Sequence, residues 1–110
     1  MNAETAKLVT LARGAKTRVK AEAGAAVRDD TGRTYTGAAV DLPSLELTAV
    51  QAAVAQAAGS GARGVEAVVV VCDVPVVEEA SLTCVRDLGG SGVLYLVCNA
   101  AGDVVEGVTT

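Results

Sequence analysis

The chain has 110 residues and a formal net charge of −4, with no histidine and only two aromatic side chains, Tyr35 and Tyr95. This length suits one domain with a substantial core, covering residues 1–110. An acidic chain repels phosphate backbones and has few rings on which bases can stack, so the composition argues against nucleic-acid binding. The longest apolar run, residues 67–72, is too short to cross a bilayer and argues against a membrane protein.

The first elements expected are a helix and a β-hairpin. Residues 4–14 carry Leu8, Leu11 and Ala12 at helical spacing, which predicts an amphipathic helix ending near Gly14. Two short strands, 23–29 and 33–40, flank Asp29-Asp30-Thr31-Gly32, a sequence typical of a tight turn.

The stretch Ser44–Ala58 predicts a central helix, because almost all its residues are good helix formers. Ser44 is the expected N-cap, Glu46 lies near the positive end of the helix dipole, and Gly59 follows as a stop. This helix is apolar nearly all the way round, so we expect it to be buried on more than one side.

The remaining elements complete an α/β domain. Residues 65–72 are too apolar for a half-exposed strand and predict an interior strand covered on both faces. A helix over 78–88 and strands over 93–98 and 103–109 follow. The last connection is too short for a parallel crossover, so the final strand pair should be antiparallel. The result is a mixed sheet with helices on both faces.

The cysteines and the N-terminus indicate the compartment. Cys72, Cys84 and Cys98 are an odd number of widely spaced thiols, typical of reduced cysteines in a cytoplasmic protein. The first residues do not combine a basic region with an apolar one, so no signal peptide is expected.

Read in this order, the chain resembles the cytidine deaminase family over nearly its whole length. Residues 23–27, Ala-Gly-Ala-Ala-Val, are similar to the family's V-G-A-A-L, and residues 30–37 resemble its D-G-K-x-Y-x-G. Matching letters of C-A-E-R-T-A-L-F-K-A-V fall on the central helix at Glu46, Thr48, Ala49, Ala53 and Val54. The resemblance implies a three-layer α/β/α fold with a five-stranded mixed sheet whose last two strands are antiparallel.

The resemblance also implies where the chemistry should be. The family holds zinc with a Cys or His at the start of the central helix and two cysteines in P-C-x-x-C, and a glutamate moves protons. Carried over, the first ligand position falls on Ser44, the proton shuttle on Glu46, and the two cysteines on Ser81 and Cys84. Serine hydroxyls stay protonated and do not replace thiolates, so no bound metal is expected.

Two alternatives to this ligand assignment stay open. Cys72 or Cys98 could complete a ligand set, with Cys72 closer to the expected site because it ends a strand there. A second register sets Thr48 and Val50 against the ligand and the shuttle, and it removes the glutamate. In neither register is zinc restored.

The substrate positions implied by the family are altered as well. Its N-x-E, which holds ribose hydroxyls, falls on Ala39 and Asp41, and an aromatic that packs on the base falls on Ala21. Asp41 keeps the ability to accept a hydroxyl hydrogen bond. Without the resemblance, Glu46 is a first-turn carboxylate, Cys84 a small buried side chain, and Ser44 and Ser81 are caps or first-turn residues.

These residues favour a non-catalytic protein of this fold that acts through self-association, as a homodimer or homotetramer, or through a nucleoside or protein partner. The alternative is an active zinc-dependent cytidine deaminase with an atypical ligand set, for which Zn would be the cofactor.

Overall fold

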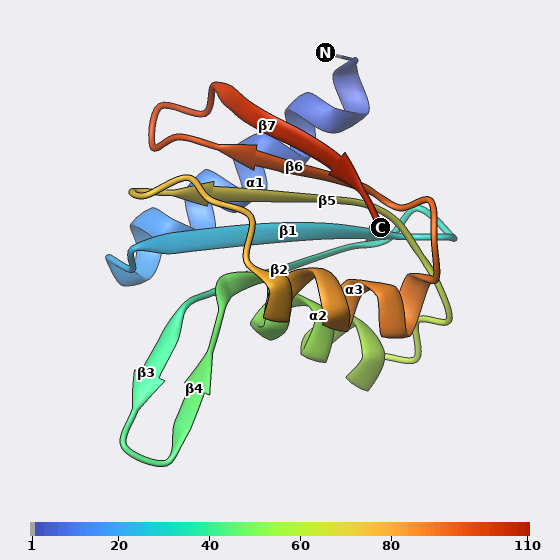
Figure 1. Cartoon of the computed structure of the whole chain (residues 1–110), viewed down its shortest axis with the longest axis horizontal. Helices are drawn as coiled ribbons and strands as arrows, with labels where there is room; N and C mark the ends of the chain where they lie inside the picture. Colours follow the sequence, from blue (N-terminus) through green and yellow to red (C-terminus); the bar gives the residue numbers. More distant parts are fainter. Residues whose placement is uncertain (1) are drawn as a thin grey trace.

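The computed structural model describes residues 2–110, which form three helices, a five-stranded sheet and a separate two-stranded hairpin. In chain order the elements are α1 (Ala3–Val19), β1 (Ala23–Asp29), β2 (Thr34–Ala38), β3 (Val40–Leu42), β4 (Leu45–Leu47), α2 (Ala49–Gly59), β5 (Val65–Cys72), α3 (Glu79–Gly89), β6 (Leu94–Cys98) and β7 (Val104–Thr109). Helix α1 covers one face of the sheet, and α2 and α3 lie together on the other (Figure 1).

The five-stranded sheet has the order β2-β1-β5-β6-β7. Strands β5 and β6 are parallel, and every other neighbouring pair is antiparallel, including β6 with β7. The predicted mixed sheet with an antiparallel final pair is therefore confirmed, as is the three-layer fold.

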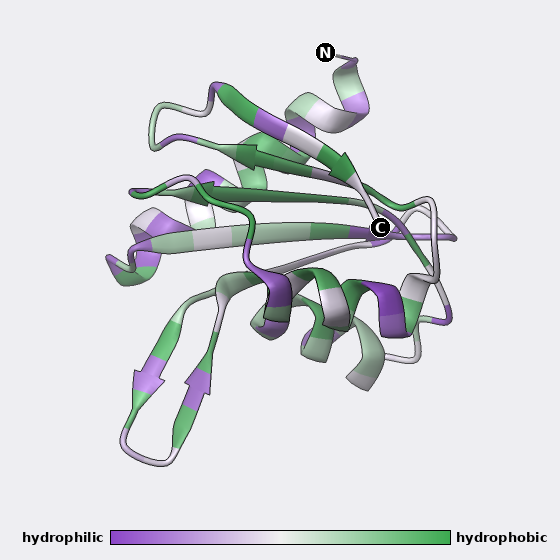
Figure 2. Cartoon of the chain, in the orientation of Figure 1, coloured by the Kyte–Doolittle hydropathy of each residue, from purple (hydrophilic) through white to green (hydrophobic). Residues whose placement is uncertain are grey.

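Strand β5 lies at the centre and is buried on both faces, as its apolar run predicts. Val68 and Val70 pack on the face of α2 and α3, whereas Val69 and Val71 pack on the face of α1. The β5 ribbon is correspondingly hydrophobic along almost its whole length in Figure 2. Two cores, one on each face of the sheet, follow from this alternation.

The first helix is longer than predicted, since α1 continues past Gly14 to Val19. Gly14 is exposed and buried Ala15 follows it, so the apolar stripe is uninterrupted and the glycine costs only its conformational entropy. The helix ends at Lys20, whose φ of 55° places it in the left-handed region and turns its N–H back to the Lys16 and Thr17 carbonyls.

The prediction that the central helix starts at Ser44 is wrong. Helix α2 begins at Ala49, with Thr48 as its N-cap. The Gln51 N–H donates to Thr48 Oγ1 over 3.0 Å, and the Thr48 N–H donates to Gln51 Oε1 over 2.9 Å. This reciprocal capping box fixes the helix start, and the residues before it form the β3–β4 hairpin instead.

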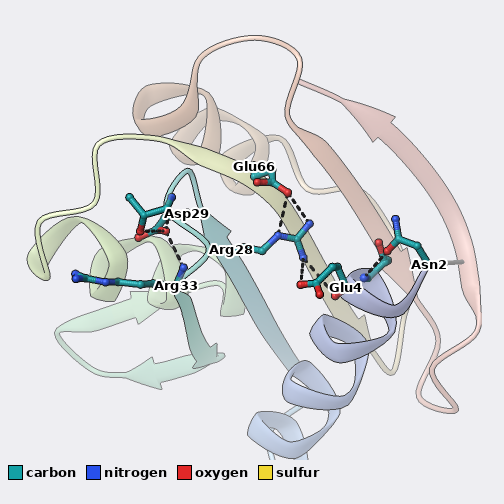
Figure 3. Close-up of polar contacts among 8 residues, drawn as sticks. Asn2, Glu4, Arg28, Asp29, Arg33 and Glu66 are labelled. Carbon is teal, nitrogen blue, oxygen red and sulfur yellow. Dashed lines mark hydrogen bonds and ion pairs between the residues drawn. The ribbon is translucent and has the colours of Figure 1, made fainter.

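Polar contacts hold α1 on the sheet and order the turn between β1 and β2 (Figure 3). Arg28 is buried, and its guanidinium donates to Glu66 Oε1 and to the Glu4 carbonyl. The Asp29 carboxylate accepts hydrogen bonds from Thr31, Arg33 and Tyr35 across the predicted turn. Burial by itself raises the pKa of Asp29, but these hydrogen bonds outweigh it and lower the pKa overall.

Within residues 2–110, none of the three helices combines the length and the apolar character that crossing a membrane requires.

Candidate functional site

Hydroxyl groups meet where α2 and α3 begin. Thr48 is the N-cap of α2, and Ser81 lies in the first turn of α3. Thr48 Oγ1 and Ser81 Oγ are 2.8 Å apart and hydrogen-bonded. Ser81 is buried, and so is Tyr95 of β6, whose hydroxyl lies next to it. Burial raises the pKa of Tyr95, and the Ser81 hydroxyl offsets only part of that effect, so the phenol stays protonated.

The Thr48 and Ser81 hydroxyls both make hydrogen bonds within the protein. Thr48 Oγ1 accepts from the Gln51 N–H while it bonds to Ser81, so capping and the helix–helix contact share one oxygen. A hydroxyl carries one donor and two acceptor positions, and Thr48 Oγ1 uses two of its three in these two bonds. The pair therefore joins the starts of two helices that are far apart in sequence.

Cys84 lies one turn beyond Ser81, and its Sγ is 3.2 Å from the Ser81 carbonyl oxygen. Burial and, secondarily, the Asp87 carboxylate raise the pKa of this thiol. Cys84 is thus a neutral donor to a backbone carbonyl rather than a thiolate.

The other two cysteines lie on opposite faces of the sheet. Cys72 belongs to the core under α2 and α3, and burial together with Glu78 raises its pKa to about 11. Cys98 packs in the core under α1, away from Thr48 and Ser81. Among residues 2–110 there is no group of three or more His, Cys, Asp or Glu side chains that could hold a metal ion.

A cavity of about 240 Å³ opens beside Thr48. Its walls include four carboxylate side chains and one amide: Glu22, Asp41, Glu46, Glu78 and Gln51. Asp41 and Glu46 are direct cross-strand neighbours in the β3–β4 hairpin. The structure therefore brings these two predicted residues together in one wall of a cavity.

Of the remaining predicted residues, Ser81 and Cys84 lie together on α3, but Ser44 does not join them. Ser44 lies in the exposed turn of the hairpin, and Glu46 is on β4 rather than in a helical first turn. Ala39 lines both the acidic cavity and a second groove beside it, whereas Ala21 lines only that second groove. Thr48 is the residue beside Ser81, and only the second register pointed to it. Its signal in the sequence is the spacing Thr48-x-x-Gln51, typical of a capping box.

We expect all three thiols to resist alkylation in the folded protein at pH 8. Iodoacetamide reacts with the thiolate, and burial raises the pKa of each of Cys72, Cys84 and Cys98. Intact-mass spectrometry after brief treatment should find unlabelled native protein and triply labelled protein in guanidinium chloride. Rapid labelling of Cys84 in the native state would contradict this and would reveal a thiolate available to a metal.

The sequence matches the family described as cytidine deaminase-like over residues 1–102. No curated protein matches it closely. Among solved structures, cytidine deaminase from Burkholderia pseudomallei is similar over 100% of this chain and 92% of its own, with 24% identity and a TM-score of 0.82. Cytidine deaminase from Mycobacterium tuberculosis is 25% identical over 86% of this chain and 85% of its own, with a TM-score of 0.74. The Mycobacterium leprae enzyme is 20% identical over 98% and 94%, with a TM-score of 0.77.

Proposed function

The chain belongs to the cytidine deaminase-like family, and we propose that it is a member without deaminase activity that acts through self-association. The observation that carries the proposal is the 2.8 Å hydrogen bond between Thr48 and Ser81 at the start of α2 and α3. We assign Thr48, Ser81 and Cys84 to the three ligand positions of the family, and Val50 to the proton-shuttle position.

The chemistry of this donor set does not fit zinc. Catalytic zinc is held by three ligands drawn from imidazole, thiolate and carboxylate groups. Thr48 and Ser81 offer neutral hydroxyls already bonded to each other, and burial keeps the proton on Cys84. A zinc ion would have to break the hydroxyl pair and would gain one thiolate at most.

The shuttle position supports the same proposal. Val50 lies two residues after the N-cap, is fully buried and belongs to the core under α2 and α3. An aliphatic side chain can neither accept nor donate a proton, so this register leaves the reaction without its acid and base. The former reaction centre then serves to hold α2 against α3. Three unpaired thiols fit a reducing compartment, so the cytoplasm is part of the proposal.

An active zinc-dependent cytidine deaminase with an atypical ligand set is the second candidate. Glu46 favours it, because this carboxylate and Thr48 line the same cavity. The same cavity also suggests a related role, in which Asp41 and Glu46 hold a nucleoside that is not converted.

Zinc content and turnover test the proposal together. We expect elemental mass spectrometry of untagged protein, purified under reducing conditions, to give far less than about one zinc per chain. Cytidine and deoxycytidine should stay unchanged after zinc is added. About one zinc per chain, with turnover abolished by Glu46→Gln and kept by Glu106→Gln, would replace the proposal with the second candidate. Glu106 is a suitable control because it is exposed on β7, outside the cavity.

A further inference from the structure

Strand β2 is the last strand at one edge of the five-stranded sheet, so one of its sides has no neighbouring strand. Residues of an antiparallel strand point their N–H and C=O groups alternately toward the partner and away from it. The Ala39 N–H donates to the Ala23 carbonyl over 3.1 Å, so Ala39 and the odd-numbered residues before it face β1. The even-numbered residues therefore point these backbone groups out of the sheet: Thr34, Thr36 and Ala38.

One part of this edge is capped by the domain itself, and another part is open. The Thr36 N–H donates to Gln56 Oε1 of α2 over 3.1 Å, which agrees with its outward direction. Residues 2–110 supply no hydrogen-bond partner to the N–H and C=O of Ala38. Unpaired backbone groups at a sheet edge are a template for pairing with another extended chain. Ala38 thus offers one donor and one acceptor to a strand from outside this domain.

A groove of about 560 Å³ follows this open edge. Strand β2 forms one side of it, and α1, α2 and β3 contribute further lining residues: Val19, Ala21, Ala52, Gln56, Val40 and Leu42. Helix α2 lies directly on β2 because Gly37 has no side chain, and an added Cβ there would overlap the Ala53 amide nitrogen. Val19 is 58% exposed and Leu42 is 56% exposed, so large aliphatic side chains in the groove lack cover.

We infer that this groove binds an extended segment of another protein, which adds to the sheet as a strand beside β2. The backbone of the segment pairs with Ala38, and its alternate side chains, which are aliphatic, pack against the apolar walls of the groove. The inference goes beyond the proposed self-association, because the occupant is a different chain.

Charge indicates that the segment is acidic. Exposed Arg18 and Lys20 lie at the end of α1, where Lys20 stands between the groove residues Val19 and Ala21. Neither basic side chain forms an ion pair within residues 2–110. Asp41 lines another part of the groove, so a carboxylate of the segment belongs beside Arg18 and Lys20.

Selection from a phage-displayed library of random peptides of about nine residues tests the inference. The selected peptides should alternate aliphatic and polar residues and carry Asp or Glu. Their synthetic forms should bind the wild type with a dissociation constant of about 10 µM or tighter in about 0.15 M salt, as measured by fluorescence anisotropy. A selection that enriches no peptide overturns the inference, and enrichment of basic peptides overturns the acidic assignment.

Ala38→Pro tests whether the bound peptide is a strand at this edge. Proline removes only the outward N–H, which takes no part in the pairing with β1, and edge strands tolerate such a residue. The affinity of the selected peptide should fall at least about 10-fold. Thr34→Pro is the matched control, because it removes an outward N–H from the same edge outside the groove and should leave binding unchanged. Circular dichroism should find both variants folded.

A charge reversal tests the basic end of the groove. Arg18→Glu should weaken binding of the acidic peptide about 5-fold, and the loss should shrink as salt is added. Lys7→Glu makes the same change in net charge at an exposed position of α1 outside the groove, so it should leave the affinity unchanged. Equal affinities of Arg18→Glu and the wild type would contradict the position given to the carboxylate.

Sedimentation velocity at up to about 100 µM separates this inference from self-association. Ala38→Pro should assemble as the wild type does. Loss of assembly in Ala38→Pro but not in Thr34→Pro would mean that a second copy occupies the edge, and it would overturn the assignment of a different chain. A wild type that is only monomeric would overturn the proposed self-association and leave peptide binding standing.

Discussion

The Gly24→Ala variant is expected to lose about 3 kcal/mol of folding free energy and about 15 °C in melting temperature. Gly24 lies on β1 beneath α1, and an added Cβ would overlap the Ala12 carbonyl oxygen and lie 2.5 Å from the Lys16 amide nitrogen. These are backbone atoms of a packed helix, so no side-chain rotation relieves the overlap. Helix α1 would have to move away from the sheet and open the core that contains Leu8 and Val69.

Gly14→Ala is the matched control, because the same chemical change is made on the helix that Gly24 contacts. An added Cβ at Gly14 meets nothing within 4 Å, and the residue is exposed within α1. Alanine there should raise stability by about 0.5 to 1 kcal/mol through its helix propensity. Thermal and urea denaturation followed by circular dichroism measure both changes. Equal stability of Gly24→Ala and the wild type would show that α1 is less closely packed on β1 than described.

Most of the fold could be predicted from local patterns, and the reason is clear at β5. The apolar run of residues 65–72 is stable only when it is buried between two layers. The turns on either side limit it to the length of a strand. The short connection after residue 98 fixed the antiparallel final pair in the same way. At Gly14 the apolar spacing allowed the helix to continue, whereas the glycine suggested a helix end. Sequence reasoning followed the glycine and placed the end of α1 too early.

The candidate site was harder, because the start of the central helix decides which residues meet. Residues 44–48 have good helix propensity, and propensity alone extends the helix back to Ser44. The structure instead uses the reciprocal Thr48–Gln51 cap and folds the preceding residues into a hairpin. That shift of four residues moves Ser44 and Glu46 away from Ser81 and brings Thr48 to it. Short Ala-rich helices carry little information about register, and the Thr48-x-x-Gln51 spacing was the one sequence signal that favoured the observed start.

Replacing Thr48 and Ser81 together by cysteine is expected to create a zinc-binding protein. The two oxygens are 2.8 Å apart and Cys84 follows Ser81 one turn later on α3, so T48C/S81C should gather three thiols where the starts of the two helices meet. A metal stabilises three nearby thiolates and lowers their pKa, which opposes the effect of burial on Cys84. Loss of the Thr48 cap should cost about 1 kcal/mol in the metal-free variant.

The matched control is S44C/S81C, which introduces the same number of thiols in the other register. Ser44 lies in the hairpin turn, outside the contact between α2 and α3, so this variant should not retain zinc after dialysis. T48C/S81C should retain about one zinc per chain and gain about 4 kcal/mol of stability at a thousandfold excess of zinc over its dissociation constant. Elemental mass spectrometry and thermal melts with and without chelator measure both effects. Retention of zinc by S44C/S81C alone would return the ligand position to Ser44 and Glu46 to the shuttle position. Retention by T48C/S81C alone would mean that two hydroxyls separate this chain from a metal-binding relative.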